Sequence, residues 1–271
     1  MHWKNAFVEK LTQGAAIWIT VLQAQGSVPR GAGTVMAVFE DTFFGTIGGG
    51  HLEFEALAEA RKYLKSPQAL PKPIEKRFAL GPSLGQCCGG ALVLSFESVT
   101  FTDAVRLQQI LDSQAAERFM PLALFGGGHV GAALINVLAP LPFHVRWVDS
   151  RDEIFPAQVP AQVVCEHSNP VQAAVSDLAP NSRVLIMSFS HAEDLDIVAA
   201  CLLRIRQHQD LPFVGLIGSA TKWATFKRRL AERGFTEAEC QQVTCPIGVP
   251  GIKGKEPEVI AVAVAAQLLQ A

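Results

Sequence analysis

Along the first hundred residues, apolar and β-branched runs alternate with glycine, proline and polar residues at the short spacing that is typical of β-strands. These runs predict strands over residues 15–23, 34–39, 42–47, 75–80 and 91–96. Between the third and fourth runs, residues 51–64 carry apolar positions at helical spacing. We therefore expect a smaller α/β domain over residues 1–100.

After residue 120, strands and helices alternate one by one. The pattern predicts strands over residues 121–125, 144–148, 161–165, 183–187 and 213–217. It predicts helices over residues 130–138, 171–178, 193–207, 220–233 and 257–270. This alternation is typical of βαβ units, so the expected fold class is α/β, with a Rossmann-like parallel-sheet domain over residues 120–271. A polar, glutamine-rich helix over residues 101–119 is expected to connect the two domains.

The composition limits which binding partners and which cellular compartment we expect for the protein. The chain has 271 residues, of which 49% are hydrophobic and 18% charged, as in a globular protein with a sizeable core. Its net charge of −2 gives no basic excess for nucleic-acid binding. The longest apolar run is too short to span a bilayer, and the first 20 residues lack a signal-peptide pattern. Six cysteines are a reduced level, so we expect a cytoplasmic protein with no membrane or nucleic-acid partner.

The loop from Gly126 to Gly131 fits the pattern G-x-G-x-x-G between a predicted strand and a predicted helix. Gly126 would permit the tight turn, Gly128 would let a phosphate approach the backbone, and Gly131 would let the helix pack on the sheet. Asp149 ends the next strand, where an exposed acid would bind a ribose hydroxyl. A nucleotide is therefore expected in this domain; the alternative is a Rossmann fold whose nucleotide site is vestigial.

A second glycine-rich turn, Gly48-Gly49-Gly50-His51, again lies between a strand and a helix. Backbone N–H groups at a glycine-rich helix start can bind an anion, and Arg30 on another loop could supply a cationic partner. The alternative is a tight turn that carries a surface histidine.

Cys87 and Cys88 stand between glycines in a third loop. Adjacent cysteines do not easily share one tetrahedral metal ion, and no second pair stands at zinc spacing. A thiol on such a loop can be a soft metal ligand or a sulfur relay. The alternative is a pair of small buried residues in a turn.

Six stretches occur in one order along nearly the whole chain: GSVPRGAG at 26–33, GTIGGGHLE at 45–53, GQCCGG at 85–90, FGGGHVG at 125–131, GLIGS at 215–219 and CPIG at 245–248. With them the chain resembles the xanthine dehydrogenase accessory protein family, the XdhC/CoxI group. The combination is much more specific than any single loop.

The resemblance implies a cytosolic chaperone rather than an enzyme. Such proteins bind the molybdenum cofactor, as molybdopterin or its dinucleotide form, and protect it while a cysteine desulfurase supports its sulfuration. They then insert it into an apo molybdenum hydroxylase such as xanthine dehydrogenase, and they are usually homodimers. The resemblance also implies that Cys87 and Cys88 contact molybdenum, and that Arg30 and the turn at residues 48–51 hold the phosphate. The Rossmann loop would hold a nucleotide or the nucleotide part of the cofactor.

The competing prediction is an NAD(P)-dependent oxidoreductase. Such an enzyme needs a proton donor placed against a substrate pocket, and the only tyrosine, Tyr63, falls in the first domain. A third interpretation is a Rossmann scaffold that binds neither ligand and only recruits partners.

Overall fold

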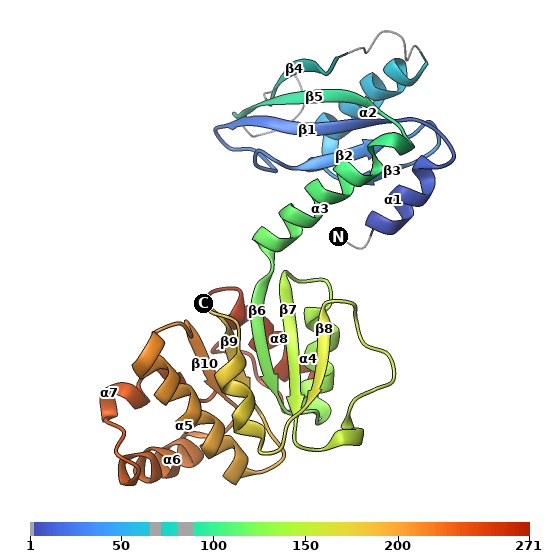
Figure 1. Cartoon of the computed structure of the whole chain (residues 1–271). Coiled ribbons are helices and arrows are strands. Elements are labelled where there is room, and N and C mark those ends of the chain that lie inside the picture. The colour runs from blue at the N-terminus through green and yellow to red at the C-terminus, as the bar shows by residue number, and fades with distance from the viewer. Residues whose placement is uncertain (1–2, 66–71, 81–88) are drawn as a thin grey trace. The chain divides into compact units, whose positions relative to one another are not determined.

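The computed structural model of the chain describes residues 3–65, 72–80 and 89–271, and the chain divides into two compact units, Met1–Glu117 and Arg118–Ala271 (Figure 1). We refer to them as unit 1 and unit 2. Each has its own sheet and its own hydrophobic cores. No described helix is both long enough and apolar enough to cross a membrane.

Unit 1 is built on a five-stranded antiparallel sheet in the order β3-β2-β1-β5-β4. Its strands are β1 (Ala16–Gln25), β2 (Val35–Val38), β3 (Phe43–Gly45), β4 (Ile74–Ala79) and β5 (Ala91–Val99). Its helices are α1 (Lys4–Leu11), α2 (Gly50–Leu64) and α3 (Ala104–Arg118). The five predicted strands and the predicted helix after the third strand are all present.

Helices cover both faces of this sheet. Because both faces of β1 are therefore buried, its sequence is a nearly continuous run of apolar residues. Ile17 and Ile19 of β1 pack in the same core as Leu52 of α2. Trp18, which points to the opposite face, packs in a second core with Phe7 of α1 and residues of α3. Successive side chains of a strand alternate between the two faces, so the same strand supplies both cores.

The helix expected as a connector between domains packs within unit 1. Ala104, Leu107 and Leu111 of α3 are buried in the core that α1 also contributes to. Val105 of the same helix is 69% exposed. The expected boundaries at residues 100 and 120 stay predictions.

Unit 2 is a six-stranded parallel sheet in the order β11-β10-β9-β6-β7-β8, and this confirms the predicted Rossmann-like fold. The strands are β6 (Met120–Phe125), β7 (Phe143–Asp149), β8 (Val163–His167), β9 (Arg183–Ile186), β10 (Phe213–Leu216) and β11 (Val243–Thr244). The helices are α4 (His129–Leu138), α5 (His191–His208), α6 (Ala220–Glu232), α7 (Glu237–Cys240) and α8 (Pro257–Leu268), with 3-10 segments η4 (Asp152–Ile154) and η5 (Val171–Asp177).

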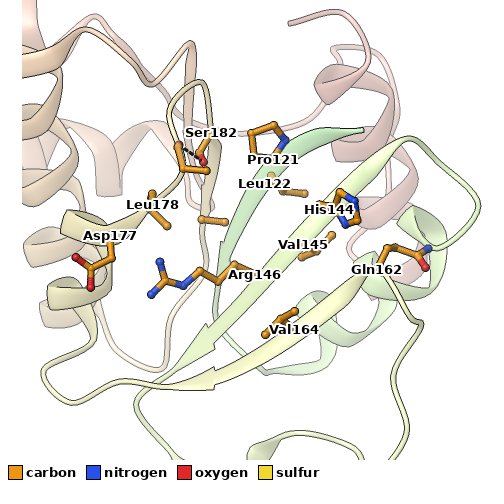
Figure 2. A pocket seen from close by; sticks show the side chains of 12 residues that line it. Pro121, Leu122, His144, Val145, Arg146, Gln162, Val164, Asp177, Leu178 and Ser182 are labelled. Carbon is orange, nitrogen blue, oxygen red and sulfur yellow. Dashed lines mark hydrogen bonds between the residues drawn. The ribbon is translucent and has the colours of Figure 1, made fainter. Parts of the chain in front are cut away.

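Helices α4 and α8 cover one face of the unit 2 sheet, and α5, α6 and η5 cover the other. The crossover from β8 to β9 is the short segment η5, so part of the sheet beside it stays open. There, a pocket of about 340 Å³ is lined by His144 and Arg146 of β7, Val164 of β8 and Leu178 (Figure 2). Val164 is 66% exposed, and Arg146 is paired with Glu166 on the same open face.

Candidate functional site

The glycine-rich loops of unit 1 meet at one end of its sheet. Gly26, which follows β1, lies so close to Gly90, which precedes β5, that a Cβ on Gly26 would stand 3.2 Å from the Gly90 Cα. A Cβ on Gly90 would in turn stand 2.7 Å from the Gln25 carbonyl oxygen. Neither position has room for a side chain, so the glycines permit the close approach of the two loops.

The same loop reaches the turn that precedes α2. A Cβ on Gly48 would stand 2.5 Å from the Pro29 ring and 3.6 Å from the Arg30 Cγ. Gly48 has a φ of 124°, a conformation that side chains rarely adopt. Residues 26–33, 46–51 and 89–90 therefore form one cluster, which we call the loop cluster of unit 1.

Some backbone donors of this turn already have an acceptor within the chain. One oxygen of Glu53, in the first turn of α2, accepts hydrogen bonds from the N–H groups of Ile47 and Gly49, each at 3.1 Å, and from the Thr46 hydroxyl at 2.5 Å. These contacts satisfy the N–H groups of Ile47 and Gly49 within the chain, and the binding of an external phosphate by the rest of the turn stays a prediction.

Arg30 and His51 of the loop cluster remain at the surface. Arg30 is exposed, and His51 is exposed with its ring stacked on Phe54 and 3.4 Å from Glu55. Cys87 and Cys88, the predicted metal contacts, lie outside the described residues. Their chain neighbours Gly89 and Gly90 belong to the cluster.

In unit 2 the glycine loop after β6 has the expected geometry. Gly126 has a φ of 125°, and a Cβ there would collide with the Met187 carbonyl oxygen. A Cβ on Gly131 would collide with the Gly126 carbonyl oxygen, so Gly131 lets α4 pack against the loop. Gly128, by contrast, faces open space with no atom within 4 Å of a Cβ position. The position expected to admit a phosphate is the open one.

Asp149 is buried rather than exposed at the strand end. It is 1% exposed, and its carboxylate accepts hydrogen bonds from the Gly127 N–H at 2.6 Å and from the Arg151 N–H at 2.9 Å. The Arg151 guanidinium donates two more, through Nε and Nη2, each at 2.9 Å. Burial alone would raise the pKa of Asp149, but these donors outweigh it and the pKa is lowered. The expectation of a surface acid is therefore wrong, because Asp149 is buried and stabilises the glycine loop through its hydrogen bond with the Gly127 N–H.

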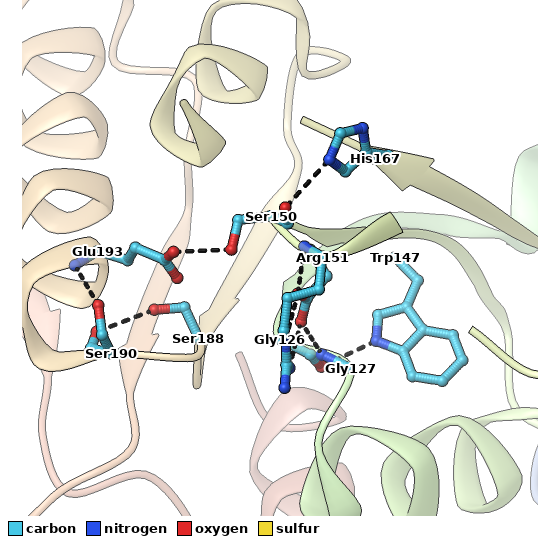
Figure 3. A network of polar contacts seen from close by, with 10 residues as sticks. Gly126, Gly127, Trp147, Ser150, Arg151, His167, Ser188, Ser190 and Glu193 are labelled. Carbon is cyan, nitrogen blue, oxygen red and sulfur yellow. Dashed lines mark hydrogen bonds and ion pairs between the residues drawn. The ribbon is translucent and has the colours of Figure 1, made fainter. Parts of the chain in front are cut away.

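Further polar contacts join Ser150, which follows β7, to Glu193 and Ser190 at the start of α5 (Figure 3). The Ser150 hydroxyl donates to Glu193 at 2.7 Å, and the Ser190 hydroxyl accepts from the Glu193 N–H at 3.2 Å as the N-cap of α5. The second carboxylate oxygen of Glu193 is buried, with no hydrogen-bond partner among the described residues. The Arg151 guanidinium stacks on the Phe189 ring at 4.5 Å.

Sequence reasoning missed a buried ion pair at the same edge of the sheet. Lys222 of α6 donates to Asp194 at 2.6 Å and to the Ile217 carbonyl at 2.8 Å, and Asp194 also accepts from the Ser188 N–H at 2.8 Å. Cys245 lies beside them: burial raises the pKa of its thiol, and the Lys222 charge offsets part of that rise. Asp194 falls in the first turn of a helix, where an acid ordinarily complements the helix dipole, so its sequence position carries no signal of this role.

The carboxyl ends of the parallel strands thus carry Gly126 after β6, Ser150 after β7, Ser188 after β9 and Cys245 after β11. In this strand order, β6 and β9 are neighbours whose connections leave in opposite directions, and ligands of such sheets bind at that crevice. Within the described parts of the chain, no group of three or more His, Cys, Asp or Glu side chains could hold a metal ion.

Comparison with known proteins finds family models that match parts of unit 1 and of unit 2. A model of the XdhC Rossmann domain matches residues 122–268, and a model of the XdhC and CoxI family matches residues 11–70. The chain is 28% identical over 255 residues to the uncharacterized protein YqeB of Escherichia coli (strain K12). That alignment covers 92% of this chain and 42% of YqeB, so the chain spans less than half the length of this relative.

A crystal structure of a xanthine dehydrogenase from Bacillus halodurans resembles the chain with a TM-score of 0.76 and 20% sequence identity. The match covers 98% of this chain and 95% of that one. At this level of identity the likeness concerns the fold.

Proposed function

The chain belongs to the XdhC and CoxI family, and from this membership we propose that it is a maturation factor for a molybdenum hydroxylase such as xanthine dehydrogenase. In this role it binds the molybdenum cofactor, as molybdopterin or its dinucleotide form, and protects it. It supports sulfuration of the cofactor by a cysteine desulfurase and inserts the cofactor into the apo hydroxylase. We further propose that it works in the cytoplasm as a homodimer.

The observation that carries the proposal is the loop cluster of unit 1. Three loops that are far apart in the sequence approach each other through glycines, at Gly26 against Gly90 and at Gly48 against Pro29. Gly48 cannot carry a side chain without moving the proline. The convergence gathers the loops that carry Arg30, His51 and the residues that follow Cys88, and this supports a binding role for this end of the sheet.

The residues present fit an anionic, sulfur-rich cargo in part. Arg30 offers an exposed cation to a phosphate, and His51, in the same loop cluster, offers an exposed ring nitrogen. The N–H groups of Ile47 and Gly49 are not offered to it, because they donate to Glu53. A thiol of Cys87 or Cys88 suits a soft metal such as dithiolene-bound molybdenum, and both residues directly precede Gly89 in the chain.

For unit 2 we propose nucleotide binding at the glycine loop. Gly128 is open, and the first turn of α4 begins there without a side-chain cap, so its N–H groups are available to a phosphate. The nucleotide is either a separate ligand or the nucleotide part of a dinucleotide cofactor.

The decisive experiment is to co-express the chain with molybdenum-cofactor biosynthesis, purify it, and measure pterin fluorescence after oxidation together with molybdenum and sulfur content. We expect pterin and molybdenum in near-equal amounts. The purified protein should also activate an apo hydroxylase in a reconstitution assay. Protein free of pterin that leaves the apo hydroxylase inactive would overturn the proposal.

An NAD(P)-dependent oxidoreductase is the second candidate, and one observation favours it. The Lys222 side chain, paired with Asp194, lies at the carboxyl edge of the unit 2 sheet, where the substrate of such an enzyme would bind. Reduction of a nicotinamide by the purified protein, lost in Lys222→Met, would favour this candidate.

A further inference from the structure

Asp149 cannot accept a ribose hydroxyl as the protein stands. An ionised carboxylate has about four acceptor sites on its two oxygens. Oδ1 accepts from the Arg151 backbone N–H and from Arg151 Nε, and Oδ2 accepts from the Gly127 N–H and from Arg151 Nη2. All of these sites are therefore used within the chain, and the residue is 1% exposed.

In place of the Asp149 carboxylate, the Arg151 guanidinium is the group at this position that can contact a ligand. Two of its five N–H donors point to Asp149, and the remaining donors have no acceptor among the described residues. Its side chain is 35% exposed, and Asp149 and Phe189 hold it on two sides. Asp149 Oδ2 accepts from both Gly127 and Arg151, which places the guanidinium beside the glycine loop (Figure 3).

In Rossmann folds, the end of the second strand meets the ribose of a bound nucleotide. An acid there favours a free 2′-hydroxyl, and an arginine favours a 2′-phosphate. We infer that Arg151 makes the nucleotide site of unit 2 selective for a ribose that carries a phosphomonoester, as in NADP or 2′,5′-ADP. Asp149 positions Arg151 and does not touch the ligand.

This inference rests on the proposed nucleotide site and goes one step further, to ligand choice. Glu193 is the nearby acid whose charge acts on Arg151, and its Oε1 accepts a hydrogen bond from Ser150 rather than from the guanidinium. A guanidinium can form bidentate contacts with carboxylates and with phosphates, so the edge of Arg151 that Asp149 leaves free suits a phosphate that approaches from solvent.

The test compares nucleotides on the unmodified protein by titration calorimetry. The probes are 2′,5′-ADP, 3′,5′-ADP, 5′-ADP and 5′-AMP, followed by NADPH and NADH. We expect 2′,5′-ADP to bind at least tenfold more tightly than 5′-AMP. It should also exceed 5′-ADP by this factor, because 5′-ADP carries its second phosphate at the 5′ end and none at the 2′ position of the ribose. NADPH should exceed NADH by a similar factor. The 3′,5′-ADP arm tells which ribose oxygen carries the recognised phosphate.

Arg151→Gln should reduce the preference for 2′,5′-ADP over 5′-AMP to less than threefold, with the larger loss of affinity on the side of 2′,5′-ADP. Arg146→Gln is the matched control, because that arginine lies on the open face of β7 and pairs with Glu166; it should keep the preference. If Arg151→Gln does not fold, Arg151→Lys retains the charge and should give an intermediate preference.

Equal affinity for 2′,5′-ADP, 5′-ADP and 5′-AMP would overturn the inference while leaving a nucleotide site in place. Absence of binding by every probe would overturn the nucleotide site as well. The two failures are therefore distinguishable.

Discussion

The carboxylate of Glu53 accepts a hydrogen bond from the backbone N–H of Gly49 at 3.1 Å, across the start of α2. A glycine-rich helix start would otherwise present such an N–H to an anion. Here the chain supplies the anion itself, so the turn is preformed and negatively charged. A phosphate that approaches the loop cluster must be attracted by Arg30 or must displace Glu53.

This relationship predicts the behaviour of Glu53→Ala. The change leaves the N–H groups of Ile47 and Gly49 without their acceptor, so we expect a loss of about 1–3 kcal/mol in the free energy of unfolding. Inorganic phosphate should restore part of that loss by occupying the vacated position, and it should stabilise the wild type less. Glu55→Ala, on the same helix but in contact with His51, is the control. Thermal unfolding in phosphate and in chloride at equal ionic strength measures both effects; equal responses of the two variants would contradict the argument.

Arg30→Ala should weaken binding of molybdopterin without affecting the fold. Arg30 is exposed, so the melting temperature should change by little. Loss of one charge-assisted contact to a phosphate typically costs about 1.5–3 kcal/mol, or roughly 10–150-fold in affinity. Arg61→Ala, an exposed arginine in the last turn of α2, should leave affinity unchanged. An unaltered affinity for Arg30→Ala would place the phosphate elsewhere.

Cys87→Ala and Cys88→Ala should lower cofactor retention or sulfuration while the fold survives. Both residues lie outside the described residues, so this prediction rests on the sequence. Cys201→Ala is the contrasting variant: burial raises the pKa of its thiol to about 12, so it is an inert core residue. It should lower stability and leave sulfuration intact. The readout is activation of an apo hydroxylase, and wild-type activation by both loop variants would contradict the assignment.

The sequence predicted most of the fold because the strands of this chain carry strong local patterns. β6 and β9 are short apolar runs between turns, and their alternation with helices is enough to indicate a parallel sheet. Helix α1 gave no such signal, since only Phe7 and Leu11 of it are buried. The two-residue strand β11 was missed as well, because a pair of residues has no period.

The site was harder to predict because residue types do not reveal which partner a polar group chooses. The positions of Gly126, Gly128 and Gly131 could be read from their spacing, since each reflects a local backbone requirement. Asp149 stands where a ribose acceptor would stand, and its sequence position is the same whether it faces a ligand or Arg151. Lys222 and Asp194 are 28 residues apart, so only the tertiary fold brings them together.

Asp149→Asn should destabilise the protein, and the effect should depend on pH. Arg151 would lose its ionised partner; because about a third of its side chain is exposed, we expect a moderate loss of about 1–3 kcal/mol at pH 7. The pKa of Asp149 is lowered below its usual value of 3.8, so its carboxylate contributes stability above the unfolded-state pKa. That contribution disappears as the pH falls through the folded-state pKa. Urea unfolding of both proteins between pH 7 and pH 3 should show the difference shrink below about pH 4. A difference that stays constant with pH would contradict this assignment.

Gly128 and Gly131 separate ligand binding from folding within one loop. Gly128 has a φ of −70° and open space around it, and it is the N-cap of α4, a position where serine is favoured. Gly128→Ser should therefore keep or slightly raise the melting temperature. The added hydroxyl would cap the N–H groups that a phosphate needs, so nucleotide affinity should fall at least tenfold.

Gly131→Ala should lower stability more than it lowers nucleotide affinity. Its Cβ would collide with the Gly126 carbonyl oxygen, and we expect this to cost about 1–3 kcal/mol in the free energy of unfolding. Gly14→Ser, an open position in unit 1, is the control that should change neither property. Differential scanning fluorimetry and calorimetric titration with 2′,5′-ADP and 5′-AMP measure the two effects on the same samples. A Gly128→Ser protein that binds nucleotide as well as the wild type would show that the phosphate does not bind at the start of α4. Unit 2 would then serve as a scaffold, and the loop cluster of unit 1 would remain as the candidate binding site.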